Sequence, residues 1–487
     1  MLIYSKITYC VCNYNNKNLR FELKNRIFAR SNLHLSLVNV VWGVGENVLK
    51  MTLFMRTTFL KSFLLVLLLA CLGFGAMAQA DVDSPYSLFG VGQVRDKSMN
   101  ARLQGMGGVA NAMFGGGMIN AENPASYAKI DTLAFLFDAG FYFKSSTFST
   151  SSLSEKASNA SFDYVSMGFG LTPWLKMALG VQPYSTSGYN MLINEIDPEV
   201  GSTTTRFKGT GGLNQVFWGN AFKLGKHFAL GANGYYVFGS SKMETTLFFP
   251  DSTYYIGSRR SVDVMVRSFM VDYGLLYNTD LGNDMNLSLG LTYTQRVKLK
   301  GEQTLFIRSI EEDMDTEVEY VIDTIINSSS PTHITMPQGF GVGVALQKGN
   351  DWTVGADFNW KQWSRFSREG VTDTLQNAWS VSAGAEFTPK HTSISGYFSR
   401  VTYRFGGFYE HGMIGLNGND GKRYSINKVG VTAGMSLPLP RTLSKVNLAL
   451  EMGQYGTREG GLIQERYAKV SVGVSVFERW FMKRKYK

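Results

Sequence analysis

Residues that could carry out catalysis are few and scattered in this sequence. The histidines after residue 80 are isolated, and most stand beside an expected turn or strand end: His227, His333, His391 and His411. None belongs to a His-Glu-x-x-His, Gly-x-Ser-x-Gly or Ser-x-x-Lys motif. The sequence therefore predicts no catalytic residue, metal site or cofactor, and a protein that is not an enzyme. A lipid hydrolase whose triad is assembled across strands stays open as an alternative.

The acidic run at residues 311–319 is the strongest candidate for a cation site, because calcium prefers several oxygen ligands. The run lacks the spacing and the glycine of an EF-hand. We interpret it as a solvated extracellular loop.

A glycine repeat at Gly339, Gly341 and Gly343 has part of the spacing of a phosphate-binding loop. No helix follows it, as such a loop requires. We interpret the repeat as one face of a strand, turned toward the lumen of a barrel.

The region before residue 80 has the features of a secretory signal peptide. Arg56 and Lys61 precede an apolar run over residues 63–74, and Ala76-Met77-Ala78 offers a small-x-small cleavage site. The run is too short to span a membrane comfortably as an anchor. We expect residues 55–78 to be the signal peptide and residues 1–54 to be an over-called N-terminal extension. A lipoprotein signal ending at Cys71 is the alternative.

Charge and cysteine content change once these residues are set aside. All the cysteines (Cys10, Cys12 and Cys71) lie before residue 80, which fits an exported protein without disulfides or thiolate metal sites. Residues 1–78 also carry a net charge of +7 out of the chain's +10. The basic pI is therefore no indication of nucleic-acid binding, and we expect no nucleic-acid partner. Residues 478–487 form a basic tail that we expect in the periplasm.

Alternation of apolar and polar residues dominates the rest of the chain. Trp352, Val354, Ala356, Phe358 and Trp360 fall on one face of a strand, and residues 428–437 and 468–476 repeat the pattern. The apolar face extends for about 9–11 residues, enough for a tilted strand to cross a bilayer. Only a closed sheet satisfies every backbone group in lipid. The fold class is therefore all-β, a transmembrane antiparallel β-barrel, with a soluble β-sandwich as the alternative.

The connections alternate between short turns and longer polar stretches, which gives about fourteen strands over residues 131–477. The longer stretches, expected to be extracellular loops, include residues 195–204, 250–257, 309–331 and 408–421. An even number of strands brings both termini to one side, which in a Gram-negative outer membrane is the periplasm.

Residues 79–130 do not alternate and are rich in glycine. Fourteen strands enclose a lumen too wide for wall side chains to fill, so we expect this segment to form a plug inside it. Asn123-Pro124-Ala125 predicts a turn, either in a movable gate or in a fixed seal. The glycines that would let the plug backbone pack closely against the wall are Gly105, Gly107 and Gly108.

With these motifs the chain resembles the FadL-type family, the outer-membrane transporters of long-chain fatty acids and aromatic hydrocarbons. In that family a Gly-rich N-terminal segment with an Asn-Pro-Ala motif folds inside a fourteen-stranded barrel as a hatch. A second match is the family's Leu-Pro…Trp…Trp-Ser-x-Phe hairpin, with Met336 in place of leucine. Its matching residues are Pro337, Trp352, Trp360, Trp363, Ser364 and Phe366.

Pro183 lies inside the expected third strand, residues 177–184. Its missing N–H interrupts the ladder, and a closed barrel then gains a local gap or bulge. The resemblance implies that substrates leave sideways through this strand. Gln182, Pro183 and Tyr184 are therefore the candidate lateral gate, with a bulge near the rim as the alternative.

Apolar residues of the plug suit a greasy ligand pocket, because methionine adapts to varied shapes. This candidate pocket comprises Met106, Met113, Phe114 and Met118. The same residues suit packing of the plug against the wall equally well.

The resemblance implies passive uptake of hydrophobic small molecules, captured near the plug and released laterally into the bilayer. The partners expected are a hydrophobic ligand, membrane lipids and other outer-membrane proteins. The alternative is a structural or shuttle component of an outer-membrane secretion or assembly complex, which uses the same barrel without transport.

Overall fold

The computed structural model describes residues 84–95, 100–115, 117–251, 254–313, 318–368, 375–393, 396–440 and 442–479. The chain divides into two compact units, Met1–Ala76 and Met77–Lys487, and every described residue belongs to the second. The expected N-terminal extension, the signal peptide and residues 480–487 of the basic tail lie outside the described residues.

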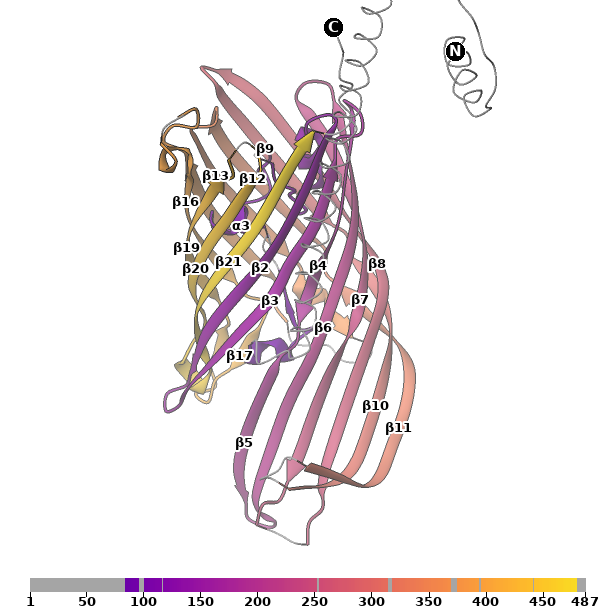
Figure 1. The fold of residues 1–487 in the computed structure, drawn as a ribbon. Helices are drawn as coiled ribbons and strands as arrows, with labels where there is room; N and C mark the ends of the chain where they lie inside the picture. Colours follow the sequence, from indigo (N-terminus) through magenta and orange to yellow (C-terminus); the bar gives the residue numbers. More distant parts are fainter. Residues whose placement is uncertain are drawn as a thin grey trace, which may run out of the picture. The chain divides into compact units, whose positions relative to one another are not determined.

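Fourteen antiparallel strands of the described residues form a closed ring (Figure 1). The first and last strands close it, pairing from Ala134↔Arg479 to Ser149↔Gln464. The ring therefore begins and ends at one rim, and the predicted barrel of fourteen strands is confirmed. The strands are β2 (Ala134–Ser149), β3 (Ser154–Phe169), β4 (Leu175–Thr186), β6 (Gly201–Leu224), β7 (Phe228–Phe248), β8 (Gly257–Gly282), β9 (Met285–Thr294), β12 (Gly339–Lys348), β13 (Trp352–Lys361), β15 (Ala378–Phe387), β16 (Thr402–His411), β19 (Lys428–Pro438), β20 (Lys445–Gly456) and β21 (Gln464–Arg479).

The two faces of the ring differ as the alternation predicts. In β13, Thr353 and Asp357 are buried toward the interior, whereas Val354 is exposed on the outside. Val429 and Val431 of β19 are likewise exposed. An exposed apolar face on every side of a closed sheet suits a barrel surrounded by lipid rather than water.

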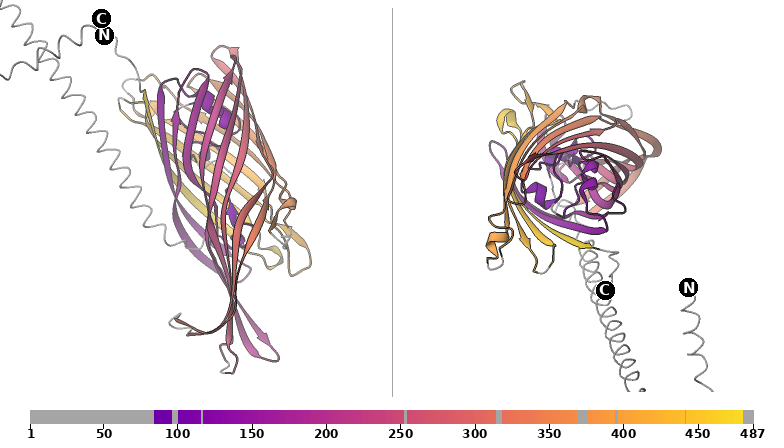
Figure 2. Two further views of the ribbon diagram at one scale, coloured as in Figure 1. Left: turned by 90° about the vertical axis from the view of Figure 1, so that its right-hand side faces the viewer. Right: turned by 90° about the horizontal axis from the view of Figure 1, so that it is seen from above.

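Residues 84–130 lie inside the ring, as the end-on view in Figure 2 shows. This plug contains short elements only: η1 (Pro85–Leu88), β1 (Gln93–Val94), α3 (Ala101–Gln104) and η2 (Pro124–Lys129). Among the described residues, no helix is both long and apolar enough to cross a membrane. The predicted plug is confirmed.

Beyond the ring, at the end opposite the rim of Ala134 and Arg479, part of the sheet continues as an extension of six strands (Figure 1). The long strands β6, β7 and β8 supply its centre, with β5 (Tyr189–Asp197) at one edge and the hairpin of β10 (Val297–Asp313) and β11 (Val318–Met336) at the other. The expected loops at residues 195–204 and 309–331 were therefore wrong in large part. Residues 195–197, 201–204, 309–313 and 318–331 belong to strands, although they lie outside the lipid-facing band on which the prediction relied.

The remaining connections carry small elements. A two-stranded sheet of β17 and β18 lies apart from the main sheet, and β14 adds two residues to the base of β11. Their bounds are η3 (Trp363–Arg365), β14 (Ser367–Arg368), η4 (Phe398–Arg400), β17 (Gly415–Asn417), β18 (Arg423–Ser425) and η5 (Glu459–Gly461).

Candidate functional site: the plug and its seat

The Asn-Pro-Ala turn is anchored by the hydrogen bonds of the Asn123 side chain. The Asn123 carboxamide oxygen caps η2 by accepting from the backbone N–H of Ala125 at 3.0 Å. Its NH₂ group donates to the carbonyl oxygens of Asn111 in the plug, at 2.5 Å, and of Leu275 in the wall, at 3.3 Å. Asn123 and Ala125 are fully buried. One side chain therefore joins the turn, the rest of the plug and the wall.

The wall opposite this turn has glycines where side chains would collide. A Cβ built on Gly231 of β7 would overlap the backbone of Pro124 and Ala125. A Cβ on Gly274 of β8 would overlap Asn123 and come within 2.9 Å of Pro124 Cδ. These two glycines form a notch into which the turn fits, and neither was singled out from the sequence.

The predicted glycines of the plug make the same kind of close contact. Gly107 adopts a φ of 74° and Gly108 one of 83°, in the left-handed region that favours glycine. The Gly107 N–H donates to Thr432 Oγ1 at 2.8 Å. A Cβ on Gly105 would lie 3.2 Å from the Gly434 Cα. The plug and wall backbones therefore touch directly here.

The glycine repeat of β12 lines the lumen as expected. A Cβ on Gly341 would come 2.8 Å from Asn111 Nδ2, and one on Gly343 would come 2.7 Å from Asn111 Cβ. The repeat is part of the plug's seat.

Buried carboxylates on the wall hold the plug by its backbone and amides. Asp357 Oδ2 accepts from the N–H groups of Ala110, at 2.6 Å, and Asn111, at 2.8 Å. Asp138 Oδ2 accepts from Asn100 Nδ2 at 2.6 Å, while its Oδ1 accepts from two wall hydroxyls. Hydrogen bonds to a charged acceptor are stronger than neutral ones.

Glu386 forms ion pairs with two arginines, one from the plug and one from the wall. It receives both Nε, at 3.1 Å, and Nη2, at 2.5 Å, of the plug residue Arg102. The wall residue Arg404 donates its Nε to the same carboxylate at 3.0 Å. All three side chains are buried, so this triad is an ion pair between plug and wall shielded from water.

Asp163 forms a further contact near the other end of the plug. It accepts from Arg95 Nη1 at 2.6 Å and from Gln104 Nε2 at 3.0 Å. Arg95 also donates to the Tyr142 hydroxyl at 2.9 Å. The plug is thus held by wall carboxylates from β2, β3, β13 and β15.

The structure places the candidate pocket residues within the plug. Met106, Met113 and Met118 are buried in a small apolar cluster with Leu103 and Val109. Phe114 is half-buried, with the Lys129 ammonium 5.0 Å from its ring centre. Burial lowers the pKa of Lys129. Phe114 and Met118 both line a cavity of about 160 Å³ beside Ile130.

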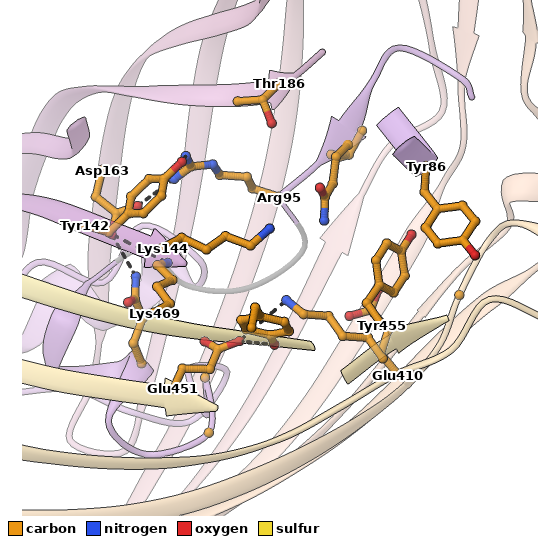
Figure 3. Close-up of a pocket in the computed structure, with 18 of the residues that line it drawn as sticks. Tyr86, Arg95, Tyr142, Lys144, Asp163, Thr186, Glu410, Glu451, Tyr455 and Lys469 are labelled. Atoms are coloured by element: carbon orange, nitrogen blue, oxygen red, sulfur yellow. Dashed lines mark hydrogen bonds and ion pairs between the residues drawn. The ribbon is translucent and has the colours of Figure 1, made fainter. Parts of the chain in front are cut away.

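The lumen beside the plug contains cavities with charged linings (Figure 3). One of about 140 Å³ is lined by Arg95, Lys144, Asp163, Glu451 and Lys469, among others. Its charges are paired: Arg95 with Asp163 at 2.6 Å and Lys469 with Asp163 at 3.8 Å. A second, of about 130 Å³, includes Gln182 and Tyr184 in its lining.

A larger cavity of about 780 Å³ lies near the rim where the ring begins and ends. The Glu386 triad lies on its inner side, and Lys445 and Arg400 also line it. In the two cavities beside the plug the polar lining exceeds the apolar lining, unlike a site for hydrophobic ligands, whereas the rim cavity mixes charged groups with a somewhat larger apolar share.

Pro183 lies where the third strand of the ring loses one neighbour. β3 and β4 pair only from Phe169↔Met177 to Val165↔Val181. The register of β4 against β6 shifts between Pro183 and Ser185. Beyond it, Ser185 and Thr186 pair with the plug strand β1 instead of β3. The wall is interrupted at Pro183, and the plug covers the interruption.

The residues of the matching hairpin lie at and beyond the other end of β12 and β13. Trp363 and Phe366 are buried, with ring centres 5.9 Å apart, and Pro337 is buried between β11 and β12. Ser364 Oγ donates to Asn377 at 2.7 Å. Trp352 and Trp360 stand half-buried at the two ends of β13. Pro337, Trp363 and Phe366 therefore pack at the base of the β10–β11 hairpin, whereas Trp352 lies at the opposite end of β13.

Sequence reasoning missed the wall carboxylates, although a signal for them exists. Asp138, Asp357 and Glu386 stand in strands whose other face meets lipid, where a charge is rare unless it has a partner. Within the described residues, no group of three or more histidine, cysteine or acidic side chains could hold a metal ion.

The ring, the enclosed plug and the interrupted third strand define a β-barrel membrane protein with the fold of the outer-membrane FadL channels. The predicted resemblance is confirmed at the level of the fold. The chain belongs to the BamG family, whose model matches residues 59–487. No curated protein matches this chain.

Solved structures with the same fold include the Pseudomonas putida toluene transporter TodX, at a TM-score of 0.51 and 16% identity, covering 80% of this chain and 100% of that one. A Pseudomonas aeruginosa FadL homologue gives 0.52 and 12%, covering 80% and 100%. The Ralstonia pickettii toluene transporter TbuX gives 0.50 and 15%, covering 77% and 97%. At identities this low, the similarity shows a shared fold and says nothing about the substrate.

Proposed function

We propose that this protein is a structural component of an outer-membrane assembly complex, the BAM complex, and that it uses a FadL-type barrel without transporting a ligand. The observation that carries the proposal is family membership over residues 59–487, because the family is named for a Bam protein. This was the alternative in the sequence analysis. It now takes precedence over uptake of hydrophobic molecules.

The lumen supports a sealed barrel. The two cavities beside the plug, of about 140 and 130 Å³, are smaller than the roughly 300–1,000 Å³ of typical small-molecule sites. Burying an apolar ligand against Arg95, Lys144 and Asp163 would strip water from charges without replacing it. The candidate methionines pack among themselves, which favours their packing role over a ligand pocket.

The contacts of the plug support a fixed seal rather than a movable gate. Opening would break the Asn123 bonds, the two amide bonds of Asp357 and the Glu386 triad. Breaking a buried ion pair alone costs about 3–5 kcal/mol.

We propose that the rim of Ala134 and Arg479 faces the periplasm and that the extension reaches outside the cell. Turns of two to six residues join the strands at this rim, except for the longer connection between β15 and β16. A signal peptide before residue 79 would deliver the chain from the periplasmic side. The expected partners are other outer-membrane proteins and membrane lipids, and we propose no catalytic activity.

The test is native purification from the membrane followed by mass spectrometry that reports bound lipids and partner proteins together. The expected result is a stoichiometric assembly with other Bam proteins and no fatty acid in the lumen. A protein that purifies alone with a bound fatty acid or aromatic hydrocarbon would contradict the proposal.

A second candidate function, passive uptake of fatty acids or aromatic hydrocarbons, is favoured by one observation. β3 and β4 stop pairing beyond Val181, next to Gln182, Pro183 and Tyr184, where a lateral gate would be. The substitution Pro183→Val tests it. If uptake of a hydrophobic probe is unchanged in a folded barrel, transport through this opening is excluded.

A further inference from the structure

The extension has two edges without a strand beside them. β5 pairs with β6 on one side only. β11 pairs with β10 along its length, and on its other side β14 pairs only with Ile334 and Thr335. Within the described residues, nothing pairs with that side over residues 318–333. An unpaired edge offers N–H and C=O groups to any chain that can extend beside it, and on β11 only Pro331 lacks the N–H.

The edge strand β11 is also bare on both faces. Residues 320–331 are all exposed. Among them, Val321 and Ile322 are 49% and 51% exposed, and Ile325 is 59% exposed. The register of β11 against β10 shifts at Ile325 and again at Ile322, so these two residues have no partner residue in β10 and stand at β-bulges. Apolar side chains are therefore exposed along this edge both at the bulges and in the regular strand, at Val321. Lipid could cover at most one of the two faces.

The hairpin also reaches well beyond the ring. The seventeen register pairs of β10 and β11 run from Val297↔Met336 to Asp313↔Val318, which at about 3.3 Å per residue is roughly 50 Å. The ring strand β9 ends at Thr294, before the hairpin begins. The apolar residues near its tip therefore lie far from the lipid-facing band.

Charge indicates the chemistry of the missing neighbour. Residues 309–332 contain no lysine or arginine, and their acidic residues are Glu311, Glu312, Asp313, Asp315, Glu317, Glu319 and Asp323. β5 and its turn are acidic as well, with Glu195, Asp197 and Glu199. A second copy of this chain would bring no lysine or arginine to face these acids, since neither β5 nor residues 309–332 contain one.

We propose that the open edge of β11 is a docking site for an extended segment of a partner protein. The segment adds as a further β-strand, alternates apolar residues with polar ones, and carries lysine or arginine to complement the acidic sequence of residues 311–323. Main-chain hydrogen bonds to β11 supply affinity, and the exposed Val321, Ile322 and Ile325 supply the apolar contacts. This inference rests on the proposed function, since it names how the barrel would bind a partner.

A short peptide of alternating valine and lysine is the probe, bound to the full protein in detergent and followed by fluorescence anisotropy. Two isomers, N-methylated on alternate amides, separate edge pairing from general stickiness, because only one set of amides faces β11. We expect one isomer to bind at least about tenfold more weakly than the other. A glutamate analogue should bind more weakly than the lysine peptide. Equal binding of the two methylated isomers, or equal binding of the glutamate analogue, would overturn the proposal.

A shortened hairpin tests the site in the protein. Replacing residues 306–327 with an Asn-Gly turn leaves Leu305↔Ser328 as the last pair. The peptide should bind at least about tenfold more weakly, because Val321, Ile322, Ile325 and the acidic residues are gone, and the β8 edge that becomes free carries Arg259 and Arg260. The double variant Leu192→Thr and Ile196→Thr on the β5 edge should bind the peptide as before. If the β5 variant lost binding and the shortened hairpin kept it, the peptide would bind at the β5 edge and the proposal would be overturned.

Native purification distinguishes the two proposals. If the full chain purifies without partners, the proposed function fails. If the full and shortened chains purify with the same partners in the same amounts, the function stands and the docking edge is wrong. We expect the shortened chain to lose one partner while its barrel stays folded.

Discussion

The strands β6, β7 and β8 run through two regions of the molecule that follow opposite rules (Figure 1). In the ring, their inner face carries glycine where the Asn-Pro-Ala turn approaches, at Gly231 and Gly274. In the extension, the same sheet holds no plug; it buries some residues, such as Ile310 and Phe248, and ends in open edges. The contribution of a residue to stability therefore depends on its position along the strand, which decides whether its side chain faces the plug, lipid or water.

The largest effect should come from the charged triad in the ring. Glu386→Ala leaves Arg102 and Arg404 buried without a counter-charge, at an expected cost of about 3–5 kcal/mol. Because the lost contact joins plug to wall, ion conductance across a planar bilayer should rise. Asp351→Asn, at a residue 51% exposed in the same cavity, is the control and should leave conductance low. A closed Glu386→Ala barrel of normal stability would refute the fixed seal.

The contrast between lipid and water can be measured at two residues of similar exposure. Val431 of β19 is 65% exposed and Ile325 of β11 is 59% exposed. Val431→Lys should destabilise the folded barrel by about 2–4 kcal/mol, because its side chain faces lipid near the middle of the strand. Ile325→Lys should change stability by no more than about 0.5 kcal/mol. Urea titration in lipid vesicles gives both values, and equal values would mean that both regions meet the same solvent.

A pair of glycines in β7 tests the fit of the plug. Gly231→Ala places a methyl group against the backbone of Pro124 and Ala125, and overpacking of this kind costs about 1–3 kcal/mol. Gly234→Ala, in the same strand, meets only Trp218 O at 3.9 Å and should be close to neutral. The readout is the urea midpoint of the barrel. Equal midpoints for the two variants would show that the notch does not hold the turn.

The sequence predicts the ring far better than the extension, and the reason is physical. Lipid enforces alternation, so residues such as Val429 and Val431 mark a strand directly. Residues 309–331 carry serines and acids on both faces, and without a lipid-facing side they have the composition of a loop. Their pairing follows from the neighbouring long strands, which local composition does not reveal.

The contacts between plug and wall are likewise predictable from the sequence only in part. Asn123 before Pro124 predicts a turn from local chemistry alone, and the glycines of the plug predict close packing. The partner of that packing lies far along the chain: Asp357 binds an amide 247 residues away. A charge in a lipid-facing strand shows that a partner exists but not which one.

The smallest measurable effect should come from the uncharged replacement of Asp357. Asp357→Asn keeps an oxygen for the Ala110 and Asn111 amides but removes the charge that strengthens both bonds, so we expect a loss of about 1–2 kcal/mol. Hydrogen exchange at those two amides should accelerate while the rest of the plug changes little. Asp280→Asn is the matched control, since Asp280 also accepts a backbone amide, from Gly282 at 2.8 Å, but in an exposed turn. Unchanged exchange at Ala110 and Asn111 would mean that the carboxylate's charge contributes nothing to holding the plug, and that the glycine fit alone keeps it in place.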